Sequence, residues 1–320
     1  MSSPVRQPDS VPDHVAAVDL GGTKTSVCLV DRAGATGPVL TRPTPAQEGP
    51  GAVLLQVADL VRESAGGHRL AGVGIGTAGV VDARTGQVVS STDAIRDWAG
   101  TPVADRLRAH LGVPVAVDND VNAHAAGEVW RGAAAGASSV LMVAVGTGVG
   151  AAVVLDGVPL RGAHHVAGEM GHVPAPGAAH LRCPSGRPGH VEAIASGPGL
   201  LRHFHALGGD PDVAETRGVV AAAGADDRVA VRAVHDAARA LGQCLAGVVT
   251  VVDPEVVVVG GGLASAAGGW WDTMETTLRA EVIDVLAALP VRRAALGATA
   301  PLVGAARHIW ETIERTKEPA

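Results

Sequence analysis

The amino-acid sequence predicts an α/β protein with two similar lobes that face a cleft. Short apolar runs typical of strands alternate along the chain with longer segments of helical spacing. A hairpin made of an apolar strand, a glycine-threonine turn and a second apolar strand occurs twice, at residues 18–31 and 143–156, which indicates an internal duplication. The chain has 320 residues, a length for which two domains are the better expectation.

The individual elements follow from periodicity and from the glycines, prolines and acids that interrupt it. Strands are predicted at residues 15–20, 25–30, 73–75, 113–117, 139–145, 151–155 and 256–259. Helices are predicted at residues 51–64, 102–111, 121–130, 225–252 and 301–315, and in the segment after residue 262. Residues 164–192 are rich in His, Gly and Pro and poor in apolar periodicity, so we expect a long functional loop there.

These elements group into two lobes. Residues 1–14 are polar and proline-rich and are expected to be a disordered tail. Residues 15–118 form the N-terminal α/β lobe, which the C-terminal helix 301–316 completes. Residues 119–300 form the C-terminal α/β lobe, which carries the loop 164–192.

Composition excludes several classes of protein. Hydrophobic residues make up 47% of the chain and charged residues 18%, enough to bury sizeable cores. With 43 Gly, one Phe and no Tyr, the core must consist mainly of Val, Ala and Leu, which argues against a single-strand nucleic-acid platform of stacked aromatics. The net charge of −7 and the absence of a basic run argue against a phosphate-backbone footprint.

Targeting signals and cysteine usage predict a cytoplasmic protein. The N-terminus lacks the charged-then-apolar pattern of a signal peptide. The uncharged stretch at residues 132–155 contains several glycines and is predicted to form two buried strands rather than a membrane span. Cys28, Cys183 and Cys244 are odd in number and far apart, which favours a reducing compartment over a disulfide framework.

Three glycine-rich turns are candidates for binding a nucleotide. A turn without β-carbons lets backbone N–H groups approach phosphate oxygens, and an acid before it can hold magnesium through water. The first turn has neither P-loop nor dinucleotide-binding spacing, and taken alone it is equally well a tight hairpin turn. Its recurrence in the second hairpin, with a triple glycine after the strand 256–259, suggests three contacts to one nucleotide. The residues concerned are Asp19 (the magnesium candidate), Gly21, Gly22, Thr23 and Lys24; Gly146, Thr147 and Gly148; and Gly260, Gly261 and Gly262.

Acids and histidines supply the remaining candidates. Asp118-Asn119-Asp120 lies at the end of a predicted strand, where a carboxylate can accept a proton from an attacking hydroxyl. Alternatively, Asp118 or Asp120 caps the following helix, and one acid can cap the helix while the other accepts the proton. Glu169 and His172 are three residues apart on one face of a turn and suit neighbouring sugar hydroxyls, although such a pair often has no function.

The loop 164–192 also raises the question of a metal. His172, His180, Cys183 and His190 lie close together in a turn-rich segment, and nitrogen and thiolate ligands suit tetrahedral zinc. Only one cysteine is present among them, and surface histidines also cluster by chance.

At these residues the chain closely resembles the ROK family of sugar kinases, within the actin-like (ribonuclease H-like) ATPase fold. The resemblance covers residues 15–311. The motifs that carry it are DLGGTKTSVCLV, GVGIGTAGVVD, VDNDVNAHAAGE, VAVGTGVGAAVVLDG, AGEMGH, CPSGRPGHVEAIASGPGL and DPEVVVVGGGL.

The resemblance implies a role for each motif. Asp120 matches the general base and also the substrate site, Asn119 a sugar ligand, and Glu169, His172 and Glu192 positions that contact sugar hydroxyls. The two glycine-threonine turns match phosphate loops and the triple glycine matches the adenosine site. The implied activity is ATP- and Mg²⁺-dependent phosphorylation of a hexose hydroxyl, with closure of the two lobes excluding water. A homodimer or a dimer of dimers is expected as well.

Two departures from the family pattern concern the sugar pocket. The family's zinc loop reads Cys-x-Cys-Gly-x-x-Gly-Cys-x-Glu with an upstream His, whereas here Ser185 replaces the second cysteine and His190 the third. We expect His172, Cys183 and His190 to hold Zn²⁺, with His180 or water completing the shell. Residues 91–98 and 77–79 also differ from the family pattern.

The alternatives follow from these departures. A non-catalytic sugar-binding protein is one. A sugar-responsive transcriptional repressor is a weaker one, because only about fourteen polar residues precede residue 15. The hexose is open among glucose, mannose, fructose, N-acetylglucosamine and N-acetylmannosamine, and polyphosphate remains an alternative donor.

Overall fold

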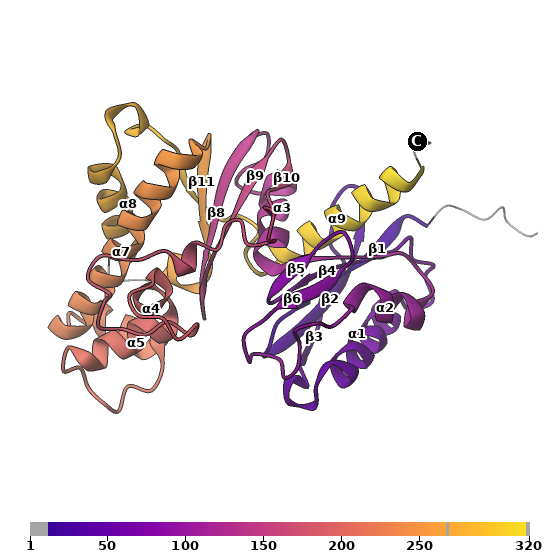
Figure 1. Ribbon diagram of the computed structural model, residues 1–320, viewed down its shortest axis with the longest axis horizontal. Helices are drawn as coiled ribbons and strands as arrows, with labels where there is room; N and C mark the ends of the chain where they lie inside the picture. The colour runs from indigo at the N-terminus through magenta and orange to yellow at the C-terminus, as the bar shows by residue number, and fades with distance from the viewer. Residues whose placement is uncertain (1–11, 267–268, 318–320) are drawn as a thin grey trace, which may run out of the picture. The chain divides into compact units, whose positions relative to one another are not determined.

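The computed structural model describes residues 12–266 and 269–317 (Figure 1). Most of the predicted tail therefore lies outside the described residues, and His14 already belongs to the first strand. Contacts divide the chain into two compact units: one runs up to Ala123 and resumes at Pro301, and the other spans His124–Ala300. This division assigns residues 119–123 to the first unit. None of the described helices is long and apolar enough to cross a membrane.

The first unit is built on a five-stranded sheet of order β3-β2-β1-β4-β7. Strands β1 and β2 form an antiparallel hairpin, whereas β4 and β7 run parallel to β1. Its strands are β1 (His14–Leu20), β2 (Lys24–Asp31), β3 (Leu40–Pro43), β4 (Val73–Thr77) and β7 (Val115–Asn119), with a small separate pair β5 (Val80–Asp82) and β6 (Gln87–Ser90). Its helices are α1 (Pro50–Ala65), α2 (Val103–Leu111) and α9 (Ala300–Lys317), with the 3₁₀ turn η1 (Ala46–Glu48).

Helices cover both faces of this sheet (Figure 1). Ile75 on β4 packs into the apolar cluster formed with α1 and α2. Its neighbour Gly74 points the other way, as strand alternation requires, and a β-carbon there would collide with the backbone of Ala305 on α9. A glycine at this position therefore lets the C-terminal helix pack directly on the sheet.

The second unit repeats the plan with a sheet of order β10-β9-β8-β11-β12. Strands β8 and β9 form the second antiparallel hairpin, and β11 runs parallel to β8. Its strands are β8 (Ser139–Val145), β9 (Val149–Leu155), β10 (Val158–Pro159), β11 (Val256–Gly260) and β12 (Val291–Arg293). Its helices are α4 (Val191–Ala195), α5 (Gly197–Ala206), α6 (Thr216–Gly224), α7 (Arg228–Val252) and α8 (Trp270–Glu281), with 3₁₀ turns η2 (Met170–His172), η3 (Gly262–Ser265), η4 (Asp284–Leu286) and η5 (Gly297–Thr299).

The shared strand order confirms the internal duplication predicted from the two hairpins. In each unit the first strand of the hairpin is central and pairs in parallel with the next long strand. The segment predicted as one helix, 225–252, is mostly α7, which begins at Arg228 because Asp227 caps it by accepting a hydrogen bond from the N–H of Ala230.

Candidate functional site

The first glycine turn connects β1 to β2 at the carboxyl edge of the first sheet. The N–H of Gly21 donates to the carbonyl of Lys24 (3.0 Å), which closes the turn. A β-carbon on Gly22 would lie 2.7 Å from the carbonyl oxygen of Ala94, so a glycine is needed there for close approach. Ala94 belongs to the segment 91–98, which therefore supports this turn. Trp98 of the same segment is buried in the first unit's core.

Asp19 precedes this turn on β1 and is mostly buried. Burial raises the pKa of the Asp19 carboxyl, and the positive charge of Lys24 partly offsets that rise. The Asp19 carboxylate and the Thr23 hydroxyl both offer oxygen atoms, the ligands that Mg²⁺ prefers.

The Asp118-Asn119-Asp120 segment ends β7 and begins α3 (Asp120–Arg131). The helix is capped by Asn119, whose Oδ1 accepts from the N–H groups of Val121 (2.9 Å) and Asn122 (3.2 Å). The amide of Asn119 therefore provides most of the capping that the alternative interpretation assigned to Asp118 or Asp120, although Asp120 Oδ1 also accepts from the N–H of Val121. Asp118 is buried and accepts from the side chain of Asn122 (3.0 Å).

The sheet brings this segment and the first turn to one edge. Leu20, Thr77 and Asn119 are in register across β1, β4 and β7. Asp120 and Gly21 thus follow strand ends two positions apart, about 10 Å by strand spacing. A second link runs through the loop after β4, because the side-chain amide of Asn119 donates to the carbonyl of Gly79 (3.0 Å).

The second glycine turn lies at the matching edge of the second sheet. The N–H of Gly146 donates to the carbonyl of Gly148 (2.9 Å), and Gly197 donates to the carbonyl of Gly146 (2.8 Å). Thr147 is exposed at the tip. Glu192 Oε2 accepts from the N–H of Val149 (2.9 Å) just after the turn.

The triple glycine begins at the last residue of β11, the strand next to β8. Gly260 pairs in register with Ala144, which brings Gly260–Gly262 beside the second turn. Gly261 has a φ of +90°, a conformation that favours glycine. A β-carbon on Gly262 would meet nothing within 4 Å, so this position borders open space.

The predicted sugar ligands Glu169, His172 and Glu192 lie together in the second unit. His172 Nε2 is 3.9 Å from Glu169 Oε2, as the three-residue spacing predicts. Burial raises the pKa of the Glu169 carboxyl, the nearby His172 lowers it, and the negative charge of Glu192 raises it further.

Three of the four predicted metal ligands come together. One ligand atom each from His172, Cys183 and His190 lies within 4.8 Å of the others. Cys183 Sγ and His172 Nδ1 are 3.6 Å apart, and two such ligands of a tetrahedral zinc are separated by about 3.5 Å. His190 Nδ1 is buried without a hydrogen-bond partner among the described residues, as expected of an atom that binds a metal. The donor set and its geometry therefore fit Zn²⁺.

His180 does not join this group, so the suggestion that it completes the shell was wrong. Its ring lies 5.7 Å from the ring of His203 on α5 instead. Ser185 is exposed at the third position of the turn that the N–H of Gly186 closes on the carbonyl of Cys183 (2.9 Å).

Two residues on α3, His124 and Glu128, were not predicted from the sequence. His124 lies near the triple glycine, and Glu128 lies near the end of the helix. The ring of His124 faces Gly260, and burial lowers the pKa of its imidazole while Glu128 raises it. Glu128 is fully buried and accepts N–H donors from Ala133 (2.7 Å), Ala295 (3.0 Å) and Leu296 (2.8 Å). Their spacing of four residues on one predicted helix face was the available signal.

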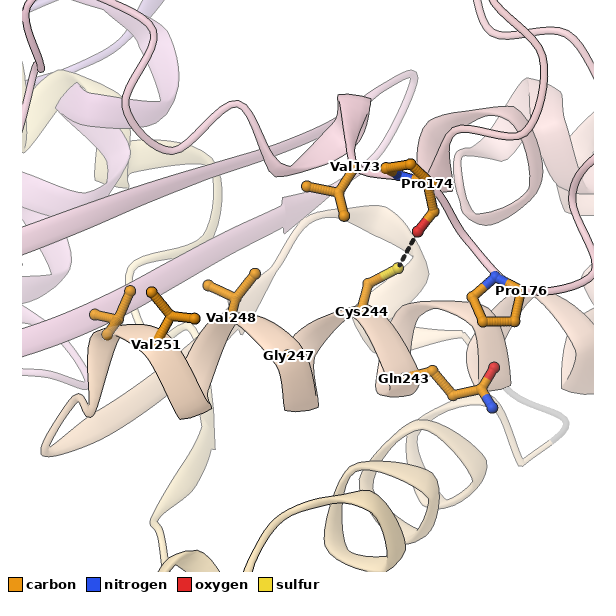
Figure 2. A pocket seen from close by; sticks show the side chains of 9 residues that line it. Val173, Pro174, Pro176, Gln243, Cys244, Gly247, Val248 and Val251 are labelled. Carbon is orange, nitrogen blue, oxygen red and sulfur yellow. Dashed lines mark hydrogen bonds between the residues drawn. The ribbon is translucent and has the colours of Figure 1, made fainter.

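A hollow also lies between the candidate metal loop, residues 164–192, and α7 (Figure 2). It is mainly apolar, with Val248 and Val251 on α7 opposite Val173 and Pro174. At its floor the Cys244 thiol donates to the carbonyl of Pro174 (3.6 Å), and burial raises the pKa of that thiol to about 11. None of the predicted site residues lines it.

The chain is similar to known proteins along most of its length. The ROK family profile matches residues 15–312. The chain is 32% identical to a glucokinase of Halalkalibacterium halodurans over 257 residues, 75% of this chain and 77% of the relative.

Two solved structures are similar over nearly the whole chain. A ROK hexokinase from Thermus thermophilus is 36% identical with a TM-score of 0.83, covering 94% of this chain and 99% of that one. A ROK family glucokinase from Streptomyces griseus, in complex with glucose and AMPPNP, is 31% identical with a TM-score of 0.80, covering 92% and 98%.

Proposed function

The chain belongs to the ROK family, and we propose that it acts there as a glucokinase-like enzyme that transfers the terminal phosphoryl group of ATP to a hexose hydroxyl. The observation that carries the proposal is the edge of the first sheet, where Asp120 and the Gly21–Lys24 turn follow strand ends two positions apart. The full-length similarity to hexose kinases supports the same activity. The fold is the actin-like ATPase fold of these kinases.

Within this proposal Asp120 is the general base that takes the proton of the sugar hydroxyl. Asn119 orients the sugar through the one hydrogen-bonding position of its side-chain amide that the described residues do not use. Both lone-pair directions of Oδ1 are used in capping α3, and one Nδ2 hydrogen is held by Gly79, so the other Nδ2 hydrogen remains to donate. Glu169, His172 and Glu192 are the proposed ligands of the other hydroxyls.

The glycine turns would bind the phosphates through backbone N–H groups, and Gly260–Gly262 would border the adenosine. Magnesium, when bound, would neutralise charge on the phosphates. Asp19 is the residue proposed to hold it, through water.

The direct test is ADP release from ATP across a panel of hexoses and N-acetylhexosamines, repeated with polyphosphate as donor. Turnover with one or more hexoses supports the kinase. Sugar binding without ADP release would favour the non-catalytic sugar-binding protein instead. Glucose is the first substrate to try, because the similar relatives are glucokinases.

We further propose a bound zinc ion held by His172, Cys183 and His190, with water in the position that Ser185 leaves without a thiolate. The ion would brace the loop that carries His172 and leads into α4, where Glu192 lies. Elemental analysis of protein purified without chelator is expected to give close to one zinc per chain. A value well under half an equivalent would reject the site.

Assembly and location remain predictions. We propose a homodimer or a dimer of dimers, which light scattering after gel filtration would measure, and no nucleic-acid partner. A cytoplasmic location agrees with three free, buried cysteines among the described residues.

A further inference from the structure

Thr44, directly after β3, holds the first glycine turn at two points. Its hydroxyl donates to the carbonyl of Gly21 (2.8 Å), and its backbone N–H donates to the carbonyl of Thr23 (3.0 Å). Thr44 comes from a different strand, more than twenty residues along the chain from Gly21. Two separate bonds from one residue thus fix both halves of the turn.

A second hydroxyl supports the first. Thr25 Oγ1 lies 2.9 Å from Thr44 Oγ1, and Thr25 is fully buried. Because a hydroxyl has one proton and Thr44 gives its own to Gly21, Thr25 must be the donor between the two threonines. A short chain of hydrogen bonds therefore runs from Thr25 through Thr44 to the turn.

The carbonyl that Thr44 holds sets the direction of the next N–H. In a planar trans peptide the C=O and the N–H point to opposite sides, so fixing the carbonyl of Gly21 toward Thr44 turns the N–H of Gly22 away from it. On another side the turn meets Ala94, whose carbonyl oxygen leaves no room for a side chain at Gly22. The peptide is thus held between two neighbours.

We propose that Thr44 is a positioning residue for the nucleotide: by holding the Gly21 carbonyl, it aims the N–H of Gly22 at a phosphate oxygen of the nucleoside triphosphate. This inference rests on the proposed kinase function. Without the hydroxyl, the Gly21 carbonyl and the Thr25 hydroxyl both lose a partner, and the orientation of the Gly21–Gly22 peptide is less well fixed.

The test is the isosteric substitution Thr44→Val, which removes the hydroxyl and retains the backbone N–H. The dissociation constant of Mg·AMPPNP, measured by calorimetry without sugar, is expected to rise about tenfold, the effect of losing one buried hydrogen bond and stranding its acceptor. The KM for ATP is expected to rise with it, and the KM for the hexose to stay within about twofold. Thr44→Ser, which keeps the hydroxyl, is expected to restore nucleotide affinity.

The matched control is Thr41→Val. Thr41 lies on β3 and shares a similar hydroxyl pair with Ser26 on β2 (3.1 Å), away from the turn. This variant is expected to bind nucleotide like the unaltered protein.

Equal losses in Thr44→Val and Thr41→Val, unaltered nucleotide affinity in Thr44→Val, or equal rises in the KM of ATP and hexose would overturn the proposal. If Thr44→Val does not fold, Thr25→Val takes its place, because it removes the donor to Thr44. The nucleotide dissociation constant is then expected to rise about two- to threefold. An unchanged constant would contradict the proposed hydrogen-bond chain from Thr25 through Thr44 to the turn. An unaltered protein that binds nucleotide but phosphorylates no sugar would defeat the kinase proposal and leave this inference testable.

Discussion

The two glycine turns occupy the same place in duplicated hairpins, yet they are held by different chemistry. Uncharged groups hold the first turn: the Thr44 hydroxyl and the backbone of Ala94. A carboxylate anchors the strand that leaves the second turn, since Glu192 accepts from the N–H of Val149. Duplication has preserved the turn and replaced its support.

This difference determines which parts of the protein can affect the conformation of each turn. Among the described residues, the side chain of Thr44 forms its hydrogen bonds with Gly21 and Thr25, which belong to the same unit. Glu192 has its second oxygen 3.7 Å from Cys183 Sγ, so one side chain connects the second turn with the candidate metal loop. A change in that loop should therefore reach the second turn, and the first turn should be insensitive to it.

The largest effect is expected at the proposed general base, which lies at the same sheet edge as the first turn. Asp120→Asn removes the proposed general base and keeps the size of the side chain, so kcat should fall at least ~10²-fold. Nucleotide affinity should be retained, because neither turn has been altered. Sugar affinity should be retained because the amide keeps the size of the carboxylate and can still form a hydrogen bond with a sugar hydroxyl. Steady-state kinetics with calorimetry for both ligands checks this.

The control for that variant is Asp105→Asn, at an exposed acid paired with Arg108 on α2. It should leave kcat unchanged. Near-full activity in Asp120→Asn would remove Asp120 from the mechanism.

A smaller effect is expected from Glu192→Gln, which tests the comparison directly. The amide can still accept from Val149, but a charge-assisted hydrogen bond becomes a neutral one, which is worth about tenfold in affinity. We expect the KM values of hexose and ATP both to rise, in contrast to Thr44→Val, which should alter only that of ATP. Nucleotide calorimetry without sugar separates the two effects.

Glu215→Gln, at an exposed acid of the same unit, is the control and should change neither constant. If Glu192→Gln weakened hexose binding alone, the contact with Val149 would carry no influence on nucleotide, and the proposed difference between the turns would disappear.

The parts of the site that the sequence predicts are those encoded in local pattern. Both hairpins, their turns and the acid at the end of β7 follow from short apolar runs and the residues that interrupt them. Short, largely exposed strands such as β3 gave no such pattern and were missed, although β3 delivers Thr44. Glu128 was missed for a related reason. Its four-residue spacing from His124 indicates only a shared helix face, and the N–H groups of Ala295 and Leu296 that it binds lie more than 160 residues away, a distance at which local pattern encodes no contact.

The smallest expected effect concerns stability and compares one buried acid from each unit. Burial raises the pKa of both Asp19 and Glu169. A nearby cation partly offsets the rise in each case, Lys24 at Asp19 and His172 at Glu169, but the negative charge of Glu192 adds to the rise at Glu169 alone. A carboxyl with a folded pKa above its unfolded value binds its proton more tightly in the folded protein, so its contribution to stability falls as the pH rises through the folded pKa.

Asp19→Asn carries no titratable proton and should escape that loss. Its melting temperature should exceed that of the unaltered protein at pH 7, and the difference should shrink toward about pH 4, near the unfolded pKa of aspartate. Thermal melts across that range measure it, with the exposed Asp59→Asn as control. A difference that did not vary with pH would mean that the cost lies in packing rather than in charge. Mg·AMPPNP affinity should fall in the same variant, because the acid that is costly to bury beside the first turn is the one proposed to hold magnesium there.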